Sequence, residues 1–287
     1  MPTSLSEGFR TFSSNLEITE LQASVVATRQ QNVRDVLTSE FEVLDTFLTG
    51  SYRRNTMIAP LAQADVDVFV VLDPRYYHDN TPRSLLERVR TRLRVTYPNT
   101  PRVSKNGQAV TITFTDFNMD VVPGFHRQGG GYLIPDAAGG RWISTDPKRH
   151  VEIWSLANQA HNGDLVPLLK MLKAWNRTHS GFVRSFHLEA LTLAVLNNVT
   201  ISDFPSGVRY VFEHARTAFT RPVLDPAGYG GNLGDYVDMV TGAEIANRLE
   251  SAYQRARDAE IRITQDRIDL AFERYRQIFG DYFPAYN

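Results

Sequence analysis

The chain has 287 residues, of which 42% are hydrophobic and 22% are charged, and its formal net charge is -1. This length and composition are those of an ordinary globular protein with one large or two modest domains, which excludes wholesale disorder. The absence of cysteine excludes disulfides, thiolate metal sites and cysteine nucleophiles, and the nearly neutral charge argues against general coating of nucleic acid.

The beginning of the sequence is predicted to contain a helix and no secretory signal. Residues 1–10 contain no basic segment that leads into a long apolar run, and no stretch of the chain has the apolar length of a bilayer span. A cytoplasmic protein without a membrane partner is therefore expected. Residues 18–37 carry apolar side chains at roughly helical spacing, which predicts a long first helix.

Strands dominate the prediction for the next hundred residues. Apolar-rich or alternating segments predict strands at 41–48, 66–72, 109–115 and 118–122. Thr81 followed by Pro82 is typical of a helix N-terminus, and the helix after it is expected to cover one side of a sheet. The glycine-rich segment 128–142 predicts a hairpin or loop rather than a helix. Its glycines lack the spacing of a phosphate loop, which argues against a Rossmann or Walker-type site.

The second half of the chain is predicted to be almost entirely helical. Asp146 and Pro147 indicate a further helix start, and the apolar periodicity predicts helices at 164–176, 186–196 and within 244–279. The predicted fold class is therefore α+β and bilobal. Residues 1–160 are expected to form a mixed sheet with flanking helices and a long N-terminal helix, and residues 161–287 a helical lobe.

Two aspartates at the start of a predicted strand carry the first chemical signal. Asp65 and Asp67 are two residues apart, so their carboxylates point to the same face of the strand. Such a pair repels unless a divalent cation lies between the carboxylates, and hard oxygen ligands suit magnesium. The pattern alone is also compatible with a solvated strand edge or a turn.

The surroundings of this pair indicate a known arrangement. Gly50 and Ser51 precede it in a predicted turn, and Asp120 follows on a later predicted strand. In order and spacing these residues resemble the polymerase-beta-like nucleotidyltransferase superfamily. The resemblance implies that Gly50 and Ser51 hold a triphosphate, and that Asp65, Asp67 and Asp120 bind two Mg²⁺ ions, for which Mn²⁺ can substitute.

That resemblance also implies a role for each carboxylate in catalysis. Asp65 and Asp67 would bind the ions that bridge the triphosphate, and Asp120 would complete one metal site and accept the proton of the attacking hydroxyl. Two metals neutralise charge on both sides of an in-line displacement, which suits phosphoryl transfer. The alternative is a structural acidic cluster, which would be costly to bury without metal.

A narrower resemblance covers nearly the whole chain. Residues 50–56, 169–175 and 184–189 are similar to motifs of the cGAS/DncV-like nucleotidyltransferases, or CD-NTases, which are cyclic-oligonucleotide synthases related to oligoadenylate synthase. The resemblance implies that Lys173 and Ser185 contact the donor triphosphate. Arg53 is a further candidate for triphosphate binding; adjacent strand residues point in opposite directions, so at most one of Arg53 and Arg54 is expected to face the site.

Several of these residues have structural alternatives. Trp175 is expected in the core, and Lys170 in solvent. Glu189 is compatible with an internal polar anchor, and Ser185 with a helix N-cap. Structural roles are expected for the two histidines near these motifs, His150 and His187, because neither has a metal-ligand partner at useful spacing.

The resemblance implies an enzyme that joins ribonucleoside triphosphates into a cyclic di- or trinucleotide messenger and releases pyrophosphate. Such synthases serve CBASS anti-phage signalling, where an effector protein senses the product. The alternatives are extension of an RNA end, as in poly(A) or CCA-adding enzymes, transfer of a nucleotide to a protein, and a catalytically silent nucleotide-binding module. No obligatory nucleic-acid partner is expected, and a monomer is favoured.

Overall fold

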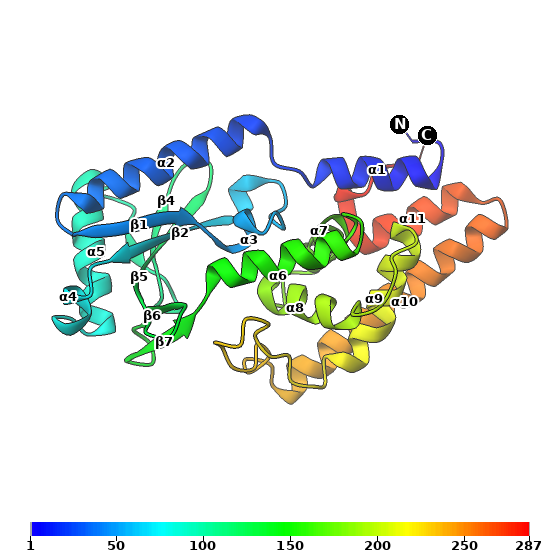
Figure 1. Cartoon of the computed structure of the whole chain (residues 1–287). Helices are drawn as coiled ribbons and strands as arrows, with labels where there is room; N and C mark the ends of the chain where they lie inside the picture. The colour runs from blue at the N-terminus through cyan, green and yellow to red at the C-terminus, as the bar shows by residue number, and fades with distance from the viewer. Residues whose placement is uncertain (1, 287) are drawn as a thin grey trace. The chain divides into compact units, whose positions relative to one another are not determined.

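The computed structural model describes residues 2–286, which divide into two compact units (Figure 1). One unit comprises residues 18–154 and carries the β-sheet. The other comprises residues 155–286 together with residues 2–17 and is helical. Within the described residues, no helix combines the length and apolar character that crossing a membrane requires.

The sheet unit combines seven strands with four α-helices that lie wholly within residues 18–154. Its elements are α2 (Glu20–Thr38), β1 (Val43–Leu48), α3 (Gly50–Arg53), β2 (Asp65–Leu72), α4 (Arg75–His78), α5 (Pro82–Thr96), β3 (Arg102–Val103), β4 (Val110–Thr113), β5 (Asn118–His126), β6 (Tyr132–Asp136) and β7 (Arg141–Thr145). The strand order is β1-β2-β5-β4-β3, and β6 joins the end of β5 to β7. Only the pair of β2 and β5 is parallel among these strands, so the sheet is mixed.

One face of this sheet forms the main core of the unit. Along β2, Val66, Val68 and Val70 are buried and pack with apolar residues of α2 and α5, which cover that face. The other face carries the alternate residues of β2, so period-2 alternation separates the core from the polar face. Phe69 and Val71 lie on that second face in a smaller cluster.

The helical unit comprises most of the second half of the chain. Its elements are α1 (Leu5–Asn15), α7 (Leu165–Thr178), α8 (Ser185–Val195), α9 (Phe204–Ala218), α10 (Met239–Thr264) and α11 (Ile268–Phe279), and α6 (Pro147–Ala160) continues into it from the sheet unit. Phe9 and Phe12 of α1 pack edge to face or tilted against Tyr275, Phe279 and Phe283. Residues 2–17 therefore belong to the helical core, which the predicted range 1–160 did not anticipate.

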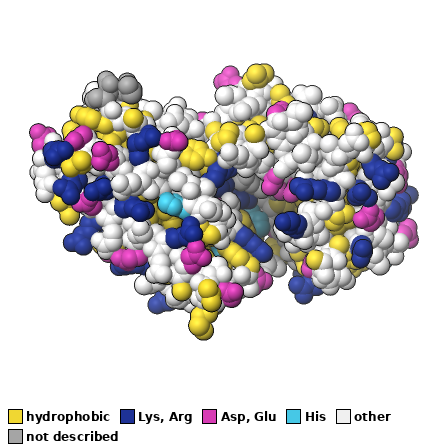
Figure 2. Space-filling model, turned by 180° about the vertical axis from the view of Figure 1, so that it is seen from behind, with side chains coloured by type: hydrophobic (Ala, Val, Ile, Leu, Met, Phe, Trp, Pro, Cys, Tyr) yellow, Lys and Arg dark blue, Asp and Glu magenta, His cyan; other side chains and the backbone are white. Residues whose placement is uncertain are grey.

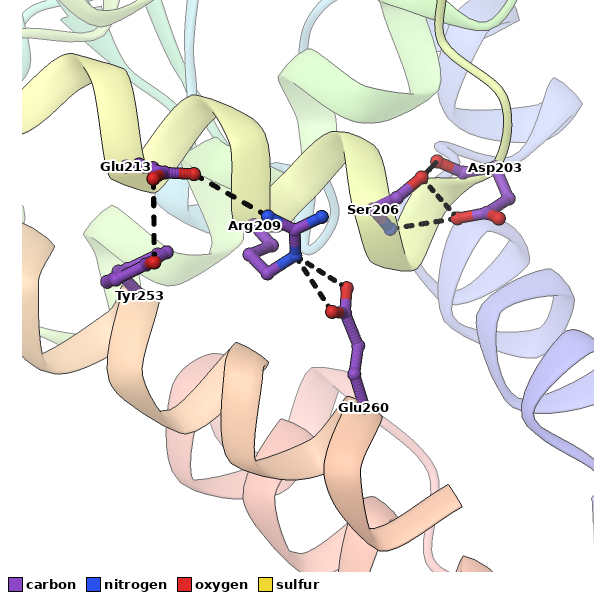
Figure 3. A network of polar contacts seen from close by, with 6 residues as sticks. All are labelled: Asp203, Ser206, Arg209, Glu213, Tyr253 and Glu260. Atoms are coloured by element: carbon purple, nitrogen blue, oxygen red, sulfur yellow. Dashed lines mark hydrogen bonds and ion pairs between the residues drawn. The ribbon is translucent and has the colours of Figure 1, made fainter. Parts of the chain in front are cut away.

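A chain of polar contacts joins α9 to α10 (Figure 3). The Arg209 guanidinium bonds Glu260 at 2.8 Å and lies 3.5 Å from Glu213, which accepts a hydrogen bond from the Tyr253 hydroxyl. At the start of α9, the Asp203 carboxylate caps the backbone N–H of Ser206 at 2.8 Å. These side chains are partly exposed, so their contacts contribute more to the specificity of the pairing between α9 and α10 than to its free energy.

The predicted α+β class is confirmed, and most predicted elements are present. The glycine-rich segment forms the hairpin of β6 and β7, and residues 244–279 form two helices. The sequence prediction missed α1, the short helix α4, α9 and the two-residue strand β3. The predicted first helix is α2, which begins at Glu20 with a Thr19 capping box.

Candidate active site

The three predicted carboxylates lie on one face of the sheet unit. Asp67 of β2 and Asp120 of β5 are direct partners in the parallel ladder, and Asp65 lies two residues before Asp67. Because alternate residues of a strand share a face, all three side chains project to the same side, opposite the main core. The structure therefore brings together the residues that the sequence predicted as a group.

Gly50 lies directly against Asp67. Its φ is +62°, and a Cβ atom at this position would lie 2.7 Å from Asp67 Cγ and overlap Oδ2. The backbone N–H of Thr49 donates to the Asp67 carbonyl at 2.9 Å, which joins the end of β1 to β2 at this point. Glycine is therefore required both for the left-handed backbone and for the close approach to the carboxylate.

The rest of the predicted glycine-serine motif forms a compact connection. Gly50 begins α3, a single turn of helix, so the predicted turn is helical. The backbone N–H groups of Thr56 and Met57 donate to the Ser51 carbonyl at 2.9 and 3.1 Å, and the buried Thr56 thereby closes the segment back onto Ser51. This closure holds the half-buried Ser51 near the strand that carries Asp67.

The carboxylates of Asp65 and Asp120 each accept a hydrogen bond from a side chain on a neighbouring strand. The Asn118 side-chain amide donates to Asp65 Oδ1 at 3.0 Å, and the Thr111 hydroxyl donates to Asp120 Oδ1 at 2.6 Å. The sequence prediction missed both donors, although the alternation of β4 already placed Thr111 on the polar side.

Burial raises the pKa of Asp120 above its usual value, and the negative charge of Asp65 raises it further. The hydrogen bond from Thr111 and the positive charge of Arg102 act in the opposite direction. Arg102 lies opposite Thr111 in the ladder, so its side chain projects to the same face. The charged form of Asp120 is therefore disfavoured in this partly buried site unless a cation neutralises it.

The chemistry of this site fits hard divalent cations such as Mg²⁺, because its donors are carboxylate oxygens. Among residues 2–286, no group of three or more acidic or histidine side chains has an arrangement that already forms a metal cage. Asp65 and Asp120 are instead turned to Asn118 and Thr111. Each of these two side chains has a second carboxylate oxygen that could serve as a ligand to a divalent cation.

Comparison with known proteins decides the family. Residues 3–158 match the Second Messenger Oligonucleotide or Dinucleotide Synthetase (SMODS) domain, a range that contains Gly50, Ser51 and all three aspartates. The chain belongs to this family. It is a nucleotidyltransferase of the cyclic-oligonucleotide-synthase group, as the sequence resemblance implied.

Relatives of this SMODS protein cover most of its length. It is 28% identical to cyclic AMP-AMP-AMP synthase from an Acinetobacter species, over 94% of this chain and 83% of that protein. It is 25% identical to a probable cyclic nucleotide synthase from Bacillus cereus, over 83% of this chain and 81% of that protein.

Solved structures share its fold at low sequence identity. The structure of Escherichia coli CdnC with ATP matches with a TM-score of 0.77 at 18% identity, over 98% of this chain and 99% of that one. The Vibrio cholerae cyclic AMP-GMP synthase DncV matches with a TM-score of 0.70 at 18% identity, over 84% of this chain and 70% of that one. The SMODS protein therefore has the cGAS/DncV-like fold that the sequence predicted.

Lys173 and Ser185, the two predicted triphosphate contacts of the helical half, belong to the helical unit. Ser185 is the exposed first residue of α8, and Arg184 occupies the N-cap position without a side-chain cap bond, so the N-cap alternative for Ser185 is wrong. Lys173 is 7% exposed and its Nζ lies 3.1 Å from Oε1 of the fully buried Glu189. Glu189 is thus the internal anchor that the sequence allowed.

Lys170 differs from its prediction. It was expected in solvent, but its side chain is 3% exposed and its Nζ binds both carboxylate oxygens of Glu17 at 2.7 and 2.8 Å. Glu17 lies 153 residues away in sequence, so local periodicity could not indicate the pair. Trp175 is buried at 1% exposure, as predicted.

Glu189→Gln is expected to destabilise the protein by about 2 kcal/mol, because the buried Lys173 ammonium loses the anionic partner that offsets its desolvation. Urea unfolding followed by tryptophan fluorescence measures this loss. The matched control is Glu244→Gln, which breaks an exposed pair with Arg248 and should cost less than about 1 kcal/mol. Equal losses in the two variants would contradict the buried role of Glu189.

Arg53 and Arg54 do not lie on a strand, so the alternation argument used for them is wrong. Arg53 ends the single helical turn α3 and is exposed. Arg54 follows as its C-cap, and its guanidinium lies 5.2 Å from the centre of the buried Trp154 ring. Arg53 therefore keeps the accessibility that a phosphate contact needs, whereas Arg54 packs against an aromatic ring.

The two histidines near the motifs are buried. His150 lies edge to face with Trp154, and His187 packs against Phe219 and Tyr236. Burial lowers the pKa of His187 to about 4, so its ring is neutral at physiological pH. These contacts support the structural roles predicted for both residues.

Proposed function

We propose that this SMODS protein joins ribonucleoside triphosphates into a cyclic di- or trinucleotide messenger and releases one pyrophosphate for each linkage formed. The observation that carries the proposal is the pairing of Asp67 with Asp120 across parallel strands, with Asp65 on the same face and Gly50 against Asp67. This arrangement provides the carboxylates and the close backbone approach that nucleotidyl transfer needs.

Each residue of the site has a proposed task. Asp65, Asp67 and Asp120 bind divalent cations, which neutralise the triphosphate and polarise its α-phosphate when bound. Asp120 accepts the proton of the attacking hydroxyl, a task to which its raised pKa is suited. Gly50, Ser51 and the exposed Arg53 hold the triphosphate, and Lys173 and Ser185 are further proposed contacts, as the sequence resemblance implies.

The relatives indicate which nucleotide and which product should be tested first. The Acinetobacter relative is a cyclic AMP-AMP-AMP synthase, and the related CdnC structure contains ATP. ATP is therefore the first substrate to test, and cyclic triadenylate is the first product to look for. We further propose that the enzyme is a cytoplasmic monomer, and that its product activates an effector protein in CBASS antiviral signalling.

Incubation with the four labelled ribonucleoside triphosphates tests this function. With Mg²⁺ or Mn²⁺ we expect a product that resists phosphatase and whose mass is that of a cyclic nucleotide, together with stoichiometric pyrophosphate. Removal of the divalent ions with EDTA should stop both signals, and excess Mg²⁺ should restore them. Linear chains on added RNA, or label on protein, would instead favour the alternative transferases.

The charge on the face seen in Figure 2 gives no support to RNA-end extension. That activity favours a continuous basic groove. On the face of the described chain in Figure 2, Lys and Arg side chains are interspersed with Asp and Glu side chains. A catalytically silent module is also disfavoured, because three repelling carboxylates on one sheet face have no structural task there.

A further inference from the structure

A row of polar residues crosses the sheet through the aspartates. Arg102 of β3 is the ladder partner of Thr111 of β4, Thr111 is the partner of Asp120, and Asp120 is the partner of Asp67. Residues that are partners in a ladder project to the same face, so Thr111 is the immediate neighbour of Asp120 on the side away from Asp67.

Thr111 differs from an ordinary strand threonine in its burial and its bond. It is 5% exposed, and its hydroxyl donates to Asp120 Oδ1 at 2.6 Å. This is the length of a hydroxyl hydrogen bond to a charged carboxylate, which is stronger than a bond between neutral groups. The bond engages one carboxylate oxygen, so the orientation of the whole group about its χ2 angle is restricted.

A comparison within the same strand supports a role in orientation. Thr113, two residues along the same strand and on the same face, is exposed and forms no comparable bond to a carboxylate. The hydrogen bond of Thr111 therefore depends on the carboxylate beside it and is not a general property of threonines in β4.

We propose that Thr111 is a positioning residue for the nucleotidyl transfer: its hydroxyl holds Oδ1 of Asp120, so that Oδ2 is directed to the divalent cation and the attacking hydroxyl. The proposal rests on the proposed function, because it assumes that Asp120 is a ligand and proton acceptor. Residues that hold a metal ligand typically affect metal affinity or activity by about 10- to 100-fold when they are replaced.

The test compares Thr111→Val with Thr111→Ser. Valine keeps the branched shape and removes the hydroxyl, so kcat for pyrophosphate release is expected to fall about 10- to 100-fold, while the KM for ATP changes less than about threefold. Serine keeps the hydroxyl and should retain activity within about threefold of the wild type. Thr113→Val, the same replacement at the neighbouring position on that face, should leave kcat unchanged.

A binding measurement separates this inference from the proposed product. Mn²⁺ binding, followed by its EPR signal with a non-hydrolysable ATP analogue present, is expected to weaken about tenfold in Thr111→Val and to be preserved in Thr111→Ser and Thr113→Val. The assay does not depend on which nucleotide product is formed. If the wild type made no cyclic product but showed this binding pattern, the proposed function would fail and the role of Thr111 would stand.

Three outcomes would overturn the inference. These are wild-type kcat and Mn²⁺ affinity in Thr111→Val, equal losses in the valine and serine variants, or an equal loss in Thr113→Val. Thermal unfolding of each variant identifies a folding defect. If Thr111→Val fails to fold, Thr111→Ala replaces it in the same comparison, with Thr113→Ala as its control.

Discussion

Replacement of both strand aspartates, Asp65→Asn with Asp67→Asn, is expected to lower pyrophosphate release from ATP at least about 1000-fold. The two amides keep the size of the side chains but remove the anionic oxygens that bind hard divalent cations. Loss of several kcal/mol of charge stabilisation in the transition state corresponds to a factor of this size. Steady-state pyrophosphate release with Mg²⁺ and ATP measures the effect.

The fold of this double variant should remain intact. Asp65 is exposed and Asp67 is half-buried, both on the polar face of β2, so the main core is untouched. Removal of two like charges relieves repulsion, and the thermal midpoint should stay the same or rise slightly. Asp79→Asn with Asp116→Asn is the matched control, since it neutralises two exposed carboxylates and should retain full activity. Undiminished synthesis by Asp65→Asn with Asp67→Asn would remove the proposed metal site.

Gly50→Ala is expected to lower kcat about 100-fold or more. The new methyl group would overlap Asp67 Oδ2 and lie 2.7 Å from Cγ, so the Asp67 carboxylate or the backbone of α3 must shift. Displacement of a catalytic group by about 1 Å can cost about 100-fold in rate. The left-handed backbone, with φ at +62°, adds about 1 kcal/mol of destabilisation.

Gly140→Ala separates the two effects of that substitution. Gly140 has a φ of +64°, and a Cβ atom there would meet nothing within 4 Å. It should therefore show the same loss of about 1 kcal/mol in urea unfolding and full enzymatic activity. If both alanine variants lost activity to the same extent, the close contact between Gly50 and Asp67 would not explain the requirement for glycine.

The grouping of the aspartates could be predicted in part from the sequence. The spacing of Asp65 and Asp67 fixes their common face, because strand side chains alternate. Placement of Asp120 beside them depended on the resemblance, since a local pattern does not show which strands are neighbours. The parallel pairing of β2 with β5 aligns Asp67 with Asp120, and β4 and β3 follow β5 in the sheet.

The residues missed by the sequence prediction depend on long-range contacts. Thr111 and Asn118 become hydrogen-bond donors to carboxylates only through the strand register. Lys170 pairs with Glu17 across most of the chain. Likewise α1 has few apolar residues of its own, and its two phenylalanines gain their packing from residues near the other end of the chain.

The packing of α1 also has a consequence for the order of folding during synthesis. Residues 18–154 form a unit with its own core, so this unit can fold once its strands have left the ribosome. Phe9 and Phe12 are made before it, yet their partners Tyr275, Phe279 and Phe283 are made after it. The aromatic face of α1 therefore stays unpacked until Tyr275, Phe279 and Phe283 have been made. A chain whose synthesis stops early would keep that face exposed to chaperones and proteases.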